Sequence, residues 1–448
     1  MFERKIMQEL IYWKNNTLTK KKALVIKGLR QIGKTYIVKK FAEQNYKSVI
    51  YINFKNNKDI KEVFEKDLNV DRIMMDLSAS LPNIKILPYK TILIFDEVQE
   101  CANARASIKP FVEDGRYDVI ATGSLLGIRG YNKKKGQGVP TGSEHIIYMK
   151  PMDFEEFLWA KGISKEVISY IKDCFYNKTQ ISNATHNAML RYFREYIVVG
   201  GLPEVVKTFI NTSDMNAVLE EQRDIIDEYK DDFGKHLDAN EYEEVDPYLL
   251  ARIEEVFDSI PSQLAKENKK FQYSKVKSSG RSSEYREAIQ WLKDAGIVSI
   301  CYNLSNLELP LEGNKIDNVF KLYMQDSGLF VAMLEKGVAG DILLGNLGGY
   351  KGAIYENIVA DAFSKIDRKL YYYRKDSGLE IDFIIRYNGE PTLVEVKSKT
   401  GHTKASNHIL SEYHTYRVKN LIKLGEYNIG YVDNKLTLPY YLTFLLVE

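Results

Sequence analysis

Cysteine is scarce in this sequence, and its scarcity excludes two kinds of stabilising framework. The 448 residues include three cysteines, Cys101, Cys174 and Cys301, which lie far apart and form no Cys-x-x-Cys pair. A disulfide scaffold or a cysteine-rich zinc site requires clustered cysteines. We therefore expect neither, and free thiols suit a reducing cytoplasm.

Long hydrophobic runs and a large net charge are also missing. No apolar run approaches the ~18 residues that span a bilayer, and the first residues, MFERKIMQELIYWKNN, lack the apolar core of a signal peptide. The 63 basic and 61 acidic residues leave a net charge of +2. This balance excludes a globally basic nucleic-acid binder but allows local basic patches. We expect a cytoplasmic protein without a membrane partner.

The length and the apolar content indicate several packed domains. A chain of 448 residues is too long for one core, and 44% hydrophobic residues with 31 tyrosines argue against disorder. Up to about residue 160, short β-branched runs alternate with longer helical stretches: ALVIKG, VIYINF, TILIFDEVQE and YDVIATGS. This alternation predicts a parallel sheet covered by helices on both faces.

A glycine loop follows the first of these strands. The segment GLRQIGKT places Gly28 and Gly33 before Lys34, Thr35 and an apolar-periodic helix. Such a loop turns backbone N–H groups toward a phosphate, its lysine reaches the β- and γ-phosphates, and its threonine binds Mg²⁺. The alternative is an ordinary loop between strand and helix. The buried strand at residues 23–26 favours a site for ATP and Mg²⁺.

The strand TILIFDEVQE supplies acids for the same site. Asp96 and Glu97 emerge at its carboxyl end, where Asp96 would hold Mg²⁺ through water and Glu97 would polarise the attacking water. The next strand ends near Thr122 and Ser124. We prefer Ser124 as a sensor of the γ-phosphate, with helix N-capping as an equal alternative. No arginine finger is assigned, because three arginines lie nearby: Arg105, Arg116 and Arg129.

The middle of the chain reads as helical. After a Gly/Lys loop at 130–143, the stretch PMDFEEFL starts a helix with a capping box between Asp153 and Glu156. Helical patterns continue to about residue 250 and include an acidic stretch at 224–246 that we interpret as a solvated face.

Residues 251–335 resemble a winged helix. Two short helices, the helix SSEYREAIQWLKDAGIV and a strand–turn–strand pattern follow one another. A basic cluster precedes the third helix: Lys269, Lys270, Lys275, Lys277 and Arg281. The cluster predicts contacts to a DNA backbone, and a solvated basic loop is the equal alternative. The last hundred residues return to an α/β pattern.

Taken together, the motifs resemble those of prokaryotic AAA-type P-loop ATPases fused to a restriction-nuclease-like, PD-(D/E)xK, domain. The resemblance covers nearly the whole chain and rests on GLRQIGKT, FDEVQE, TGSLLG, PMDFEEF, GGLPEVV and the terminal YEN, EIDF and VEVK. It implies an AAA-type sheet with a helical lid, a winged-helix-like module and a nuclease-fold tail. It supplies no settled physiological reaction.

The same resemblance assigns a metal site to the tail. PD-(D/E)xK nucleases carry an Asp on one strand and a Glu-x-Lys on the next, which here are Asp382, Glu395 and Lys397. The two acids would bind Mg²⁺, and the lysine would position water or stabilise developing charge. Glu356 fits as an additional metal-binding acid. Two alternatives remain open: Glu380 replaces Asp382 if the register slips by two, or the residues form a surface ion pair.

The predicted fold class is therefore α/β throughout. The predicted parts are an AAA-type ATPase domain (1–160), a helical lid (161–250), a winged-helix-like module (251–335) and a nuclease-like domain (345–448). We expect an ATP-hydrolysing enzyme whose nucleotide state controls a metal-dependent nuclease acting on nucleic acid, DNA in the first instance, with a second copy of the chain as a further candidate partner. The alternative is a signalling or scaffold ATPase whose tail only binds nucleic acid or a partner protein. A small-molecule kinase would leave most of the chain unexplained.

Overall fold

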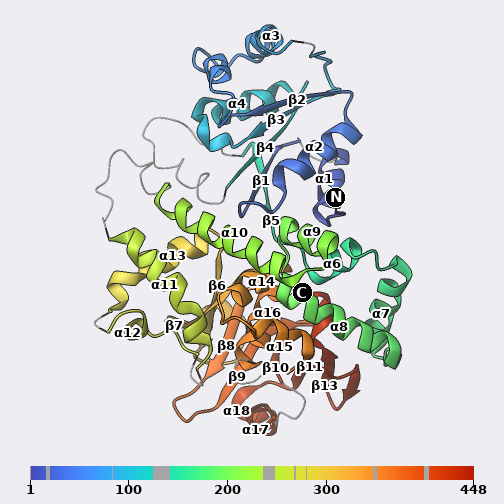
Figure 1. Ribbon diagram of the computed structural model, residues 1–448, viewed down its shortest axis with the longest axis vertical. Coiled ribbons are helices and arrows are strands. Elements are labelled where there is room, and N and C mark those ends of the chain that lie inside the picture. The colour runs from blue at the N-terminus through green and yellow to red at the C-terminus, as the bar shows by residue number, and fades with distance from the viewer. Residues whose placement is uncertain are drawn as a thin grey trace. The chain divides into compact units, whose positions relative to one another are not determined.

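The computed structural model describes residues 2–16, 21–82, 84–124, 142–235, 248–266, 269–278, 280–346, 351–397 and 403–447. The chain divides into two compact units (Figure 1). The N-terminal unit comprises Glu3–Lys150 and Asp232–Asp246, and the C-terminal unit comprises Met1–Phe2, Pro151–Asp231 and Pro247–Glu448.

A five-stranded, all-parallel sheet forms the centre of the N-terminal unit, in the order β2-β3-β4-β1-β5 (Figure 1). Its strands are β1 (Ala23–Gly28), β2 (Ser48–Asn53), β3 (Thr91–Asp96), β4 (Asp118–Ser124) and β5 (Glu144–Met149). Every residue of β1 and β3 is buried, as expected for parallel strands covered on both faces. The predicted parallel sheet is confirmed, and the carboxyl ends of its strands share one edge.

Helices cover both faces of this sheet. They are α1 (Ile6–Asn15), α2 (Lys34–Asn45), α3 (Val70–Ser80) and α4 (Ala102–Asp114), with the 3-10 turns η1 (Asp59–Phe64) and η2 (Val98–Glu100). Leu93 and Phe95 of β3 share one hydrophobic cluster with Ile73 of α3 and Ile108 of α4. Helix α2 packs on β1, β3 and β4, and its buried Phe41 lies outside that cluster.

The chain after β5 is helical, as predicted. Its helices are α6 (Phe154–Ala160), α7 (Lys165–Asn177), α8 (Asn183–Val199), α9 (Pro203–Thr212) and α10 (Met215–Lys235). The Glu156 N–H donates to Asp153 Oδ1 at 2.9 Å and the Asp153 N–H donates to Glu156 Oε2 at 3.1 Å, so the predicted capping box is confirmed. Residues 130–141 of the predicted loop and 236–246 of the acidic stretch lie outside the described residues.

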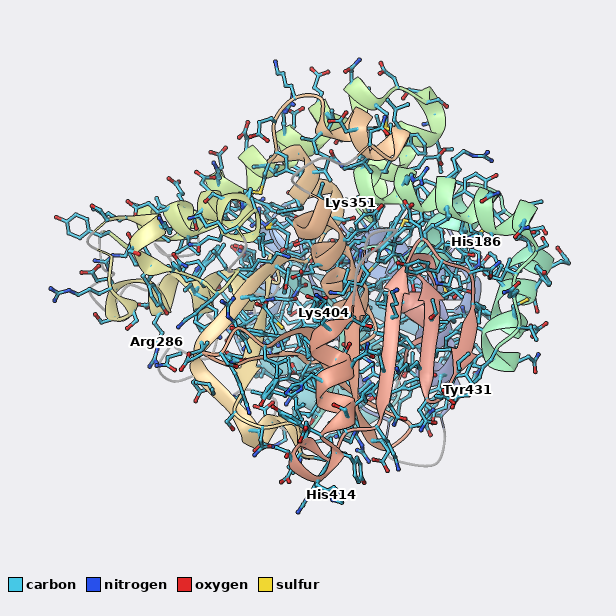
Figure 2. All side chains as sticks on the ribbon, turned by 90° about the horizontal axis from the view of Figure 1, so that it is seen from below. His186, Arg286, Lys351, Lys404, His414 and Tyr431 are labelled. Carbon is cyan, nitrogen blue, oxygen red and sulfur yellow. The ribbon has the colours of Figure 1, made fainter. Side chains whose placement is uncertain are left out.

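An eight-stranded mixed sheet forms the core of the C-terminal unit, in the order β12-β13-β11-β10-β9-β8-β6-β7. Its strands are β6 (Val298–Leu304), β7 (Lys315–Met324), β8 (Leu370–Arg374), β9 (Glu380–Tyr387), β10 (Glu390–Val396), β11 (Asn420–Gly425), β12 (Gly430–Val432) and β13 (Lys435–Pro439). The accompanying helices are α11 (Leu249–Leu264), α12 (Tyr273–Val276), α13 (Ser282–Asp294), α14 (Ser327–Ala332), α15 (Val338–Leu344), α16 (Lys351–Lys365), α17 (Lys404–Ser411) and α18 (Tyr413–Tyr416), with the 3-10 turns η4 (Leu311–Asn314) and η5 (Tyr440–Leu445). Figure 2 shows Arg286 of α13 and Tyr431 of β12 on opposite sides of this unit.

The hairpin of β6 and β7 is part of this large sheet. Strand β6 pairs antiparallel with β7 and parallel with β8, where Cys301 lies opposite Leu370. The order α11, α12, α13, β6, β7 matches the elements expected within 251–335, yet its strands share one sheet with those of 345–448. The four-part division and the winged-helix identity stay predictions.

Candidate functional site

The glycine loop joins the carboxyl end of β1 to the first turn of α2. Gly33 has a φ of 86°, a left-handed conformation that favours glycine. A Cβ atom on Gly28 would lie 2.5 Å from the carbonyl oxygen of Met149 and 2.4 Å from Ile32 Cδ1. Glycine at this position lets the loop begin close to β5. The loop leads into the N-terminus of a 12-residue helix, a favourable place for phosphate.

Lys34 brings a buried cation to this loop. Its Nζ donates to the carbonyl oxygens of Gly28 at 3.0 Å and Leu29 at 2.6 Å. Burial lowers the pKa of the Lys34 ammonium to about 8, while the carboxylates of Glu97 and Asp96 act in the opposite direction. The amine is therefore inside the loop and within electrostatic reach of both predicted acids.

Asp96 lies at the end of β3 and receives the predicted contact from the loop. The Thr35 hydroxyl donates to both Asp96 oxygens, at 3.0 and 3.1 Å. A hydroxyl and a buried carboxylate side by side form an oxygen donor set of the kind Mg²⁺ prefers, so these residues fit the ion. Glu97, the next residue, has a left-handed backbone with φ of 53°, and its carboxylate accepts a hydrogen bond from the Gln99 amide.

Thr122 and Ser124, at the end of β4, have different neighbours. Thr122 donates to Asp96 Oδ1, whereas Ser124 lies opposite Gly28 in the β1–β4 pairing. Both lie at the same edge as the loop. The sensor role of Ser124 stays a prediction, and the alternative of helix capping falls on residues 125–141, outside the described residues.

Two of the three candidate arginine fingers are engaged within the N-terminal unit. Arg105 is buried and donates to Glu144 through Nε at 3.1 Å and Nη2 at 3.0 Å. Arg116 pairs with Asp114 and Asp71, each at 2.6 Å. Arg129 lies outside the described residues.

Two residues of β2 that no sequence motif indicated also reach Asp96. The Tyr51 hydroxyl donates to Asp96 Oδ2 at 2.7 Å, and Asn53 Nδ2 donates to the same oxygen at 3.1 Å. Asn53 is paired with Asp96 in the parallel β2–β3 register. The signal available in the sequence was a polar residue at the carboxyl end of a strand in the predicted parallel sheet.

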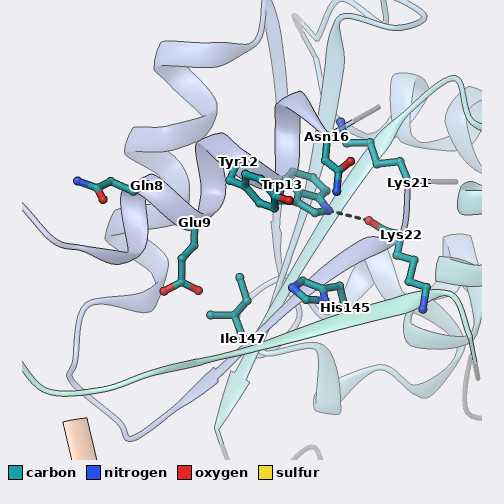
Figure 3. Close-up of a pocket in the computed structure, with 9 residues that line it drawn as sticks. All are labelled: Gln8, Glu9, Tyr12, Trp13, Asn16, Lys21, Lys22, His145 and Ile147. Carbon is teal, nitrogen blue, oxygen red and sulfur yellow. Dashed lines mark hydrogen bonds between the residues drawn. The ribbon is translucent and has the colours of Figure 1, made fainter. Parts of the chain in front are cut away.

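A separate cavity of about 530 Å³ lies at the other end of β1. It is bordered by α1, by Lys21 and Lys22 just before β1, and by His145 and Ile147 of β5 (Figure 3). The Trp13 indole N–H donates to the Lys22 carbonyl at 2.8 Å beside it. No predicted site residue lines this cavity, which lies near the amino ends of β1 and β5.

In the C-terminal unit, the predicted acids of β9 and β10 converge on one lysine. Lys397 Nζ lies 2.7 Å from Glu395 Oε2 and 3.8 Å from Asp382 Oδ2. The Val396 N–H donates to Asp382 Oδ2 at 2.8 Å. Burial raises the pKa of Asp382 to about 7, and the charges of Glu356 and Glu395 act in the same direction.

Glu356 is buried on α16 and turned toward cations. It forms an ion pair with Lys269, lies 3.5 Å from Lys321 Nζ, and accepts from the Tyr323 hydroxyl at 3.0 Å. Although burial acts to raise the pKa of Glu356, Lys321 and Lys269 hold it below its ordinary value. Glu380 belongs to the same network and pairs with Lys321 at 2.8 Å, so Asp382 is the acid of β9 nearest to Lys397.

Three-ligand metal binding in the tail stays a prediction. Across the described ranges, no group of three or more His, Cys, Asp or Glu side chains is arranged to hold a metal ion. Asp382 and Glu395 form an acidic pair suited to one cation. In the structure, the Lys397 ammonium lies against both acids.

The structure corrects one member of the predicted basic cluster. Lys269 points inward to Glu356, with 14% of its side chain exposed, because the buried carboxylate requires a counter-charge. It is not free to contact a phosphate. Lys275, Lys277 and Arg281 are exposed.

The fold and the loop–acid geometry define a P-loop nucleoside triphosphatase. Residues 20–158 match a family model described as an AAA domain (AAA_14). Residues 190–339 and 351–442 match two domains of unknown function, DUF8612 and DUF4143. The protein is therefore an ATPase with an AAA-type catalytic domain, and these matches assign no chemistry to the remaining chain.

Two solved structures are more distantly similar to the chain. A Walker-type ATPase of Pyrococcus abyssi is 13% identical with a TM-score of 0.42, over 74% of this chain and 96% of that one. The ORC2 protein of Aeropyrum pernix, in ADPNP–ADP complexes, is 11% identical with a TM-score of 0.36, over 76% and 92%. Similarities this low carry no functional argument. No curated protein matches the sequence.

Within the residues that the structure describes, no helix is both long and apolar enough to cross a membrane.

Proposed function

We propose that this ATPase acts on nucleic acid, DNA in the first instance, and that its nucleotide state controls metal-dependent cleavage of phosphodiester bonds by the C-terminal unit. The observation that carries this proposal is the convergence of Asp382 and Glu395 on the ammonium of Lys397. Asp382 lies on β9, Glu395 on β10 and Lys397 directly after β10. Glu395 is buried and Asp382 is half-buried, with 14% of its side chain exposed, which supports a site over a solvated ion pair.

In the N-terminal unit, Lys34 would bind the β- and γ-phosphates, and Thr35 with Asp96 would hold Mg²⁺. Bound Mg²⁺ neutralises the charge on the phosphates. Glu97 orients the attacking water, and Ser124 senses the γ-phosphate. Glu97→Gln should keep ATP binding and lose turnover by about 10²–10⁴-fold, as removal of a general base does. A variant with undiminished turnover would remove Glu97 from this role.

In the C-terminal unit, Asp382 and Glu395 would hold a divalent ion, with Glu356 as an additional acid. When bound, such an ion would polarise the phosphate and lower the pKa of a bound water. Lys397 would stabilise the negative charge that develops on the phosphate. Lys397 Nζ lies within 4 Å of both acids, so Lys397 would have to leave them when a cation binds there.

Exposed cations of the C-terminal unit support contact with a nucleic-acid backbone. Lys275, Lys277 and Arg281 lie on and around α12. Neutralising all three should flatten the salt dependence of DNA binding by roughly 0.9 log unit per contact per tenfold salt. An unchanged slope would identify the three residues as an ordinary solvated face.

The main test incubates the full chain with plasmid or single-stranded DNA, with and without ATP, in Mg²⁺ or Mn²⁺. Asp382→Asn and Lys397→Ala should abolish cleavage. Glu390→Gln is the matched control, since it removes an exposed carboxylate from β10, the strand that carries Glu395, and should leave cleavage intact. Lys34→Ala should remove the dependence on ATP. If the parent protein cuts no DNA or RNA under any of these conditions, the cleavage proposal is wrong.

A second candidate function is an ATPase whose C-terminal unit only binds nucleic acid or a partner protein. The neutralisation of Glu356 by Lys269 and Lys321 favours it, because the acid is already satisfied by the protein itself. Salt-dependent DNA binding without cleavage, unaffected by Asp382→Asn, would select this alternative.

A further inference from the structure

Asp96 is surrounded by donors from three other elements of the N-terminal unit. Its side chain is buried, and Thr35 of α2 and Thr122 of β4 both donate to it. Tyr51 and Asn53 of β2 add two donors to Oδ2, at 2.7 and 3.1 Å. A carboxylate held from several directions has little rotational freedom.

The orientation of the Asn53 amide is fixed by the turn that follows β2. Asn53 Oδ1 accepts from the N–H groups of Lys55 at 3.1 Å and Asn56 at 3.0 Å. With the oxygen engaged in this way, Nδ2 is the end of the amide that faces Asp96, because a flip would cost both backbone hydrogen bonds. The turn therefore aims a donor at the acid.

The Tyr51 ring is held by a contact with helix α2. Lys39 of α2 places its Nζ 3.5 Å from the centre of the ring, a cation–π contact. Asn53 Nδ2 also lies 3.4 Å from the Tyr51 hydroxyl. Tyr51 thus connects the helix that follows the phosphate loop to the acid at the end of β3.

We propose that Tyr51 and Asn53 are positioning residues for ATP hydrolysis, which keep the Asp96 carboxylate turned so that it and the Thr35 hydroxyl serve the same Mg²⁺. Neither residue needs to touch nucleotide; both act through Asp96. Outer partners of metal-holding groups typically account for 10–100-fold in metal affinity or activity. The inference concerns the ATPase reaction and is independent of the C-terminal site.

The test is Tyr51→Phe in the full chain, compared with Tyr46→Phe. Both changes remove a tyrosine hydroxyl that donates to an aspartate, since Tyr46 donates to Asp118 at 2.6 Å in the same unit. For Tyr51→Phe, the Mg²⁺ concentration that gives half-maximal turnover should rise about 10–100-fold, and excess Mg²⁺ should restore turnover. The thermal stabilisation that Mg²⁺ adds in the presence of ADP should shift to higher Mg²⁺ in parallel. ADP affinity in EDTA should stay at the parent value.

A second variant, Asn53→Ser, tests the same proposal in case Tyr51→Phe does not fold. Asn53→Ser keeps a side-chain oxygen for the following turn but is too short to reach Asp96, and it should raise the Mg²⁺ requirement in the same direction. Combined with Tyr51→Phe, its effect should be less than additive, because both act on one carboxylate. The proposal is overturned if a folded Tyr51→Phe or Asn53→Ser protein keeps the Mg²⁺ dependence of the parent. An equal shift in Tyr46→Phe would overturn it as well.

Discussion

At the scale of single residues, the buried ammonium of Lys34 links ATP binding to pH. Burial lowers its pKa to about 8, and only the protonated amine pairs with phosphate. ATP affinity of the parent should therefore fall as pH rises from 7 to 9. Lys34→Ala should weaken binding by about 100-fold or more, as loss of a buried charge partner does, and its residual affinity should lack this pH dependence. Fluorescent-nucleotide titrations across this range measure both effects.

Asp382 makes the stability of the folded protein depend on pH. Its pKa is raised, whereas the pKa of Lys34 is lowered. The folded-state pKa of Asp382, about 7, lies above the ordinary value of 3.8, so the folded protein holds the proton more tightly than the unfolded chain. Without divalent metal, its contribution to stability should decline as pH rises from about 4 to about 7 and then level off. Stabilisation by Mg²⁺ or Mn²⁺ should grow over the same interval, because the metal replaces the proton.

Thermal melts of the parent and Asp382→Asn at several pH values, in EDTA and in Mg²⁺, isolate this contribution by difference. Asp382→Asn should show neither the decline in stability with rising pH nor the stabilisation by metal. Identical curves for the two proteins would separate Asp382 from metal binding.

At the scale of elements, the segments GGLPEVV and PMDFEEF pack closely against one another. The Met152 N–H donates to the Gly201 carbonyl at 2.7 Å, and a Cβ on Gly201 would lie 2.1 Å from Met152 O. Gly201→Ala must push apart the start of α6 and the α8–α9 turn, which should cost about 1–3 kcal/mol. Gly340→Ala in helix α15 is the control, since no atom beyond its chain neighbours and its own helix backbone lies within 4 Å of its Cβ position, and it should stabilise by about 0.4–1 kcal/mol. Urea unfolding measures both, and equal effects would refute the packing argument.

Local pattern accounts for what the sequence could predict at this scale. The strand that ends at Gly28, the acids at the carboxyl end of β3 and the Asp153 capping box are encoded by neighbours in sequence, so periodicity and spacing were enough to predict them. Tyr51 and Lys269 depend on partners far along the chain: Asp96 for the first and Glu356 for the second. A lysine in a basic run looks the same whether it faces solvent or a buried acid. The pairing of β6 with β8 was hidden for a similar reason, because the alternation in VSICYNL does not specify its neighbour.

At the scale of the whole molecule, the shared eight-stranded sheet makes the predicted nuclease-like segment dependent on residues before it. A fragment of residues 345–448 lacks β6 and β7 and leaves the edge of β8 unpaired. It also removes Lys269 and Lys321 from the buried Glu356. An uncompensated buried charge costs about 3–5 kcal/mol, so this fragment should show no cooperative melt by circular dichroism. A fragment of residues 151–448 retains both strands and both lysines and should melt cooperatively.

A point variant tests the same dependence without cutting the chain. Lys321 is 1% exposed, pairs with Glu380 at 2.8 Å, and lies 3.5 Å from Glu356. Lys321→Met keeps the length of the side chain but leaves two carboxylates short of a counter-charge, and it should destabilise the full chain by about 3–5 kcal/mol. Lys369→Met is the control, because that lysine is 73% exposed in its ion pair with Glu312 and should change stability by less than about 1 kcal/mol. If Lys321→Met and Lys369→Met unfold at the same denaturant concentration, β7 does not stabilise the C-terminal site. The same conclusion follows if residues 345–448 melt as cooperatively as residues 151–448. A large difference between the variants would mean that the acids of the C-terminal site are held in place by a strand outside the segment that carries them.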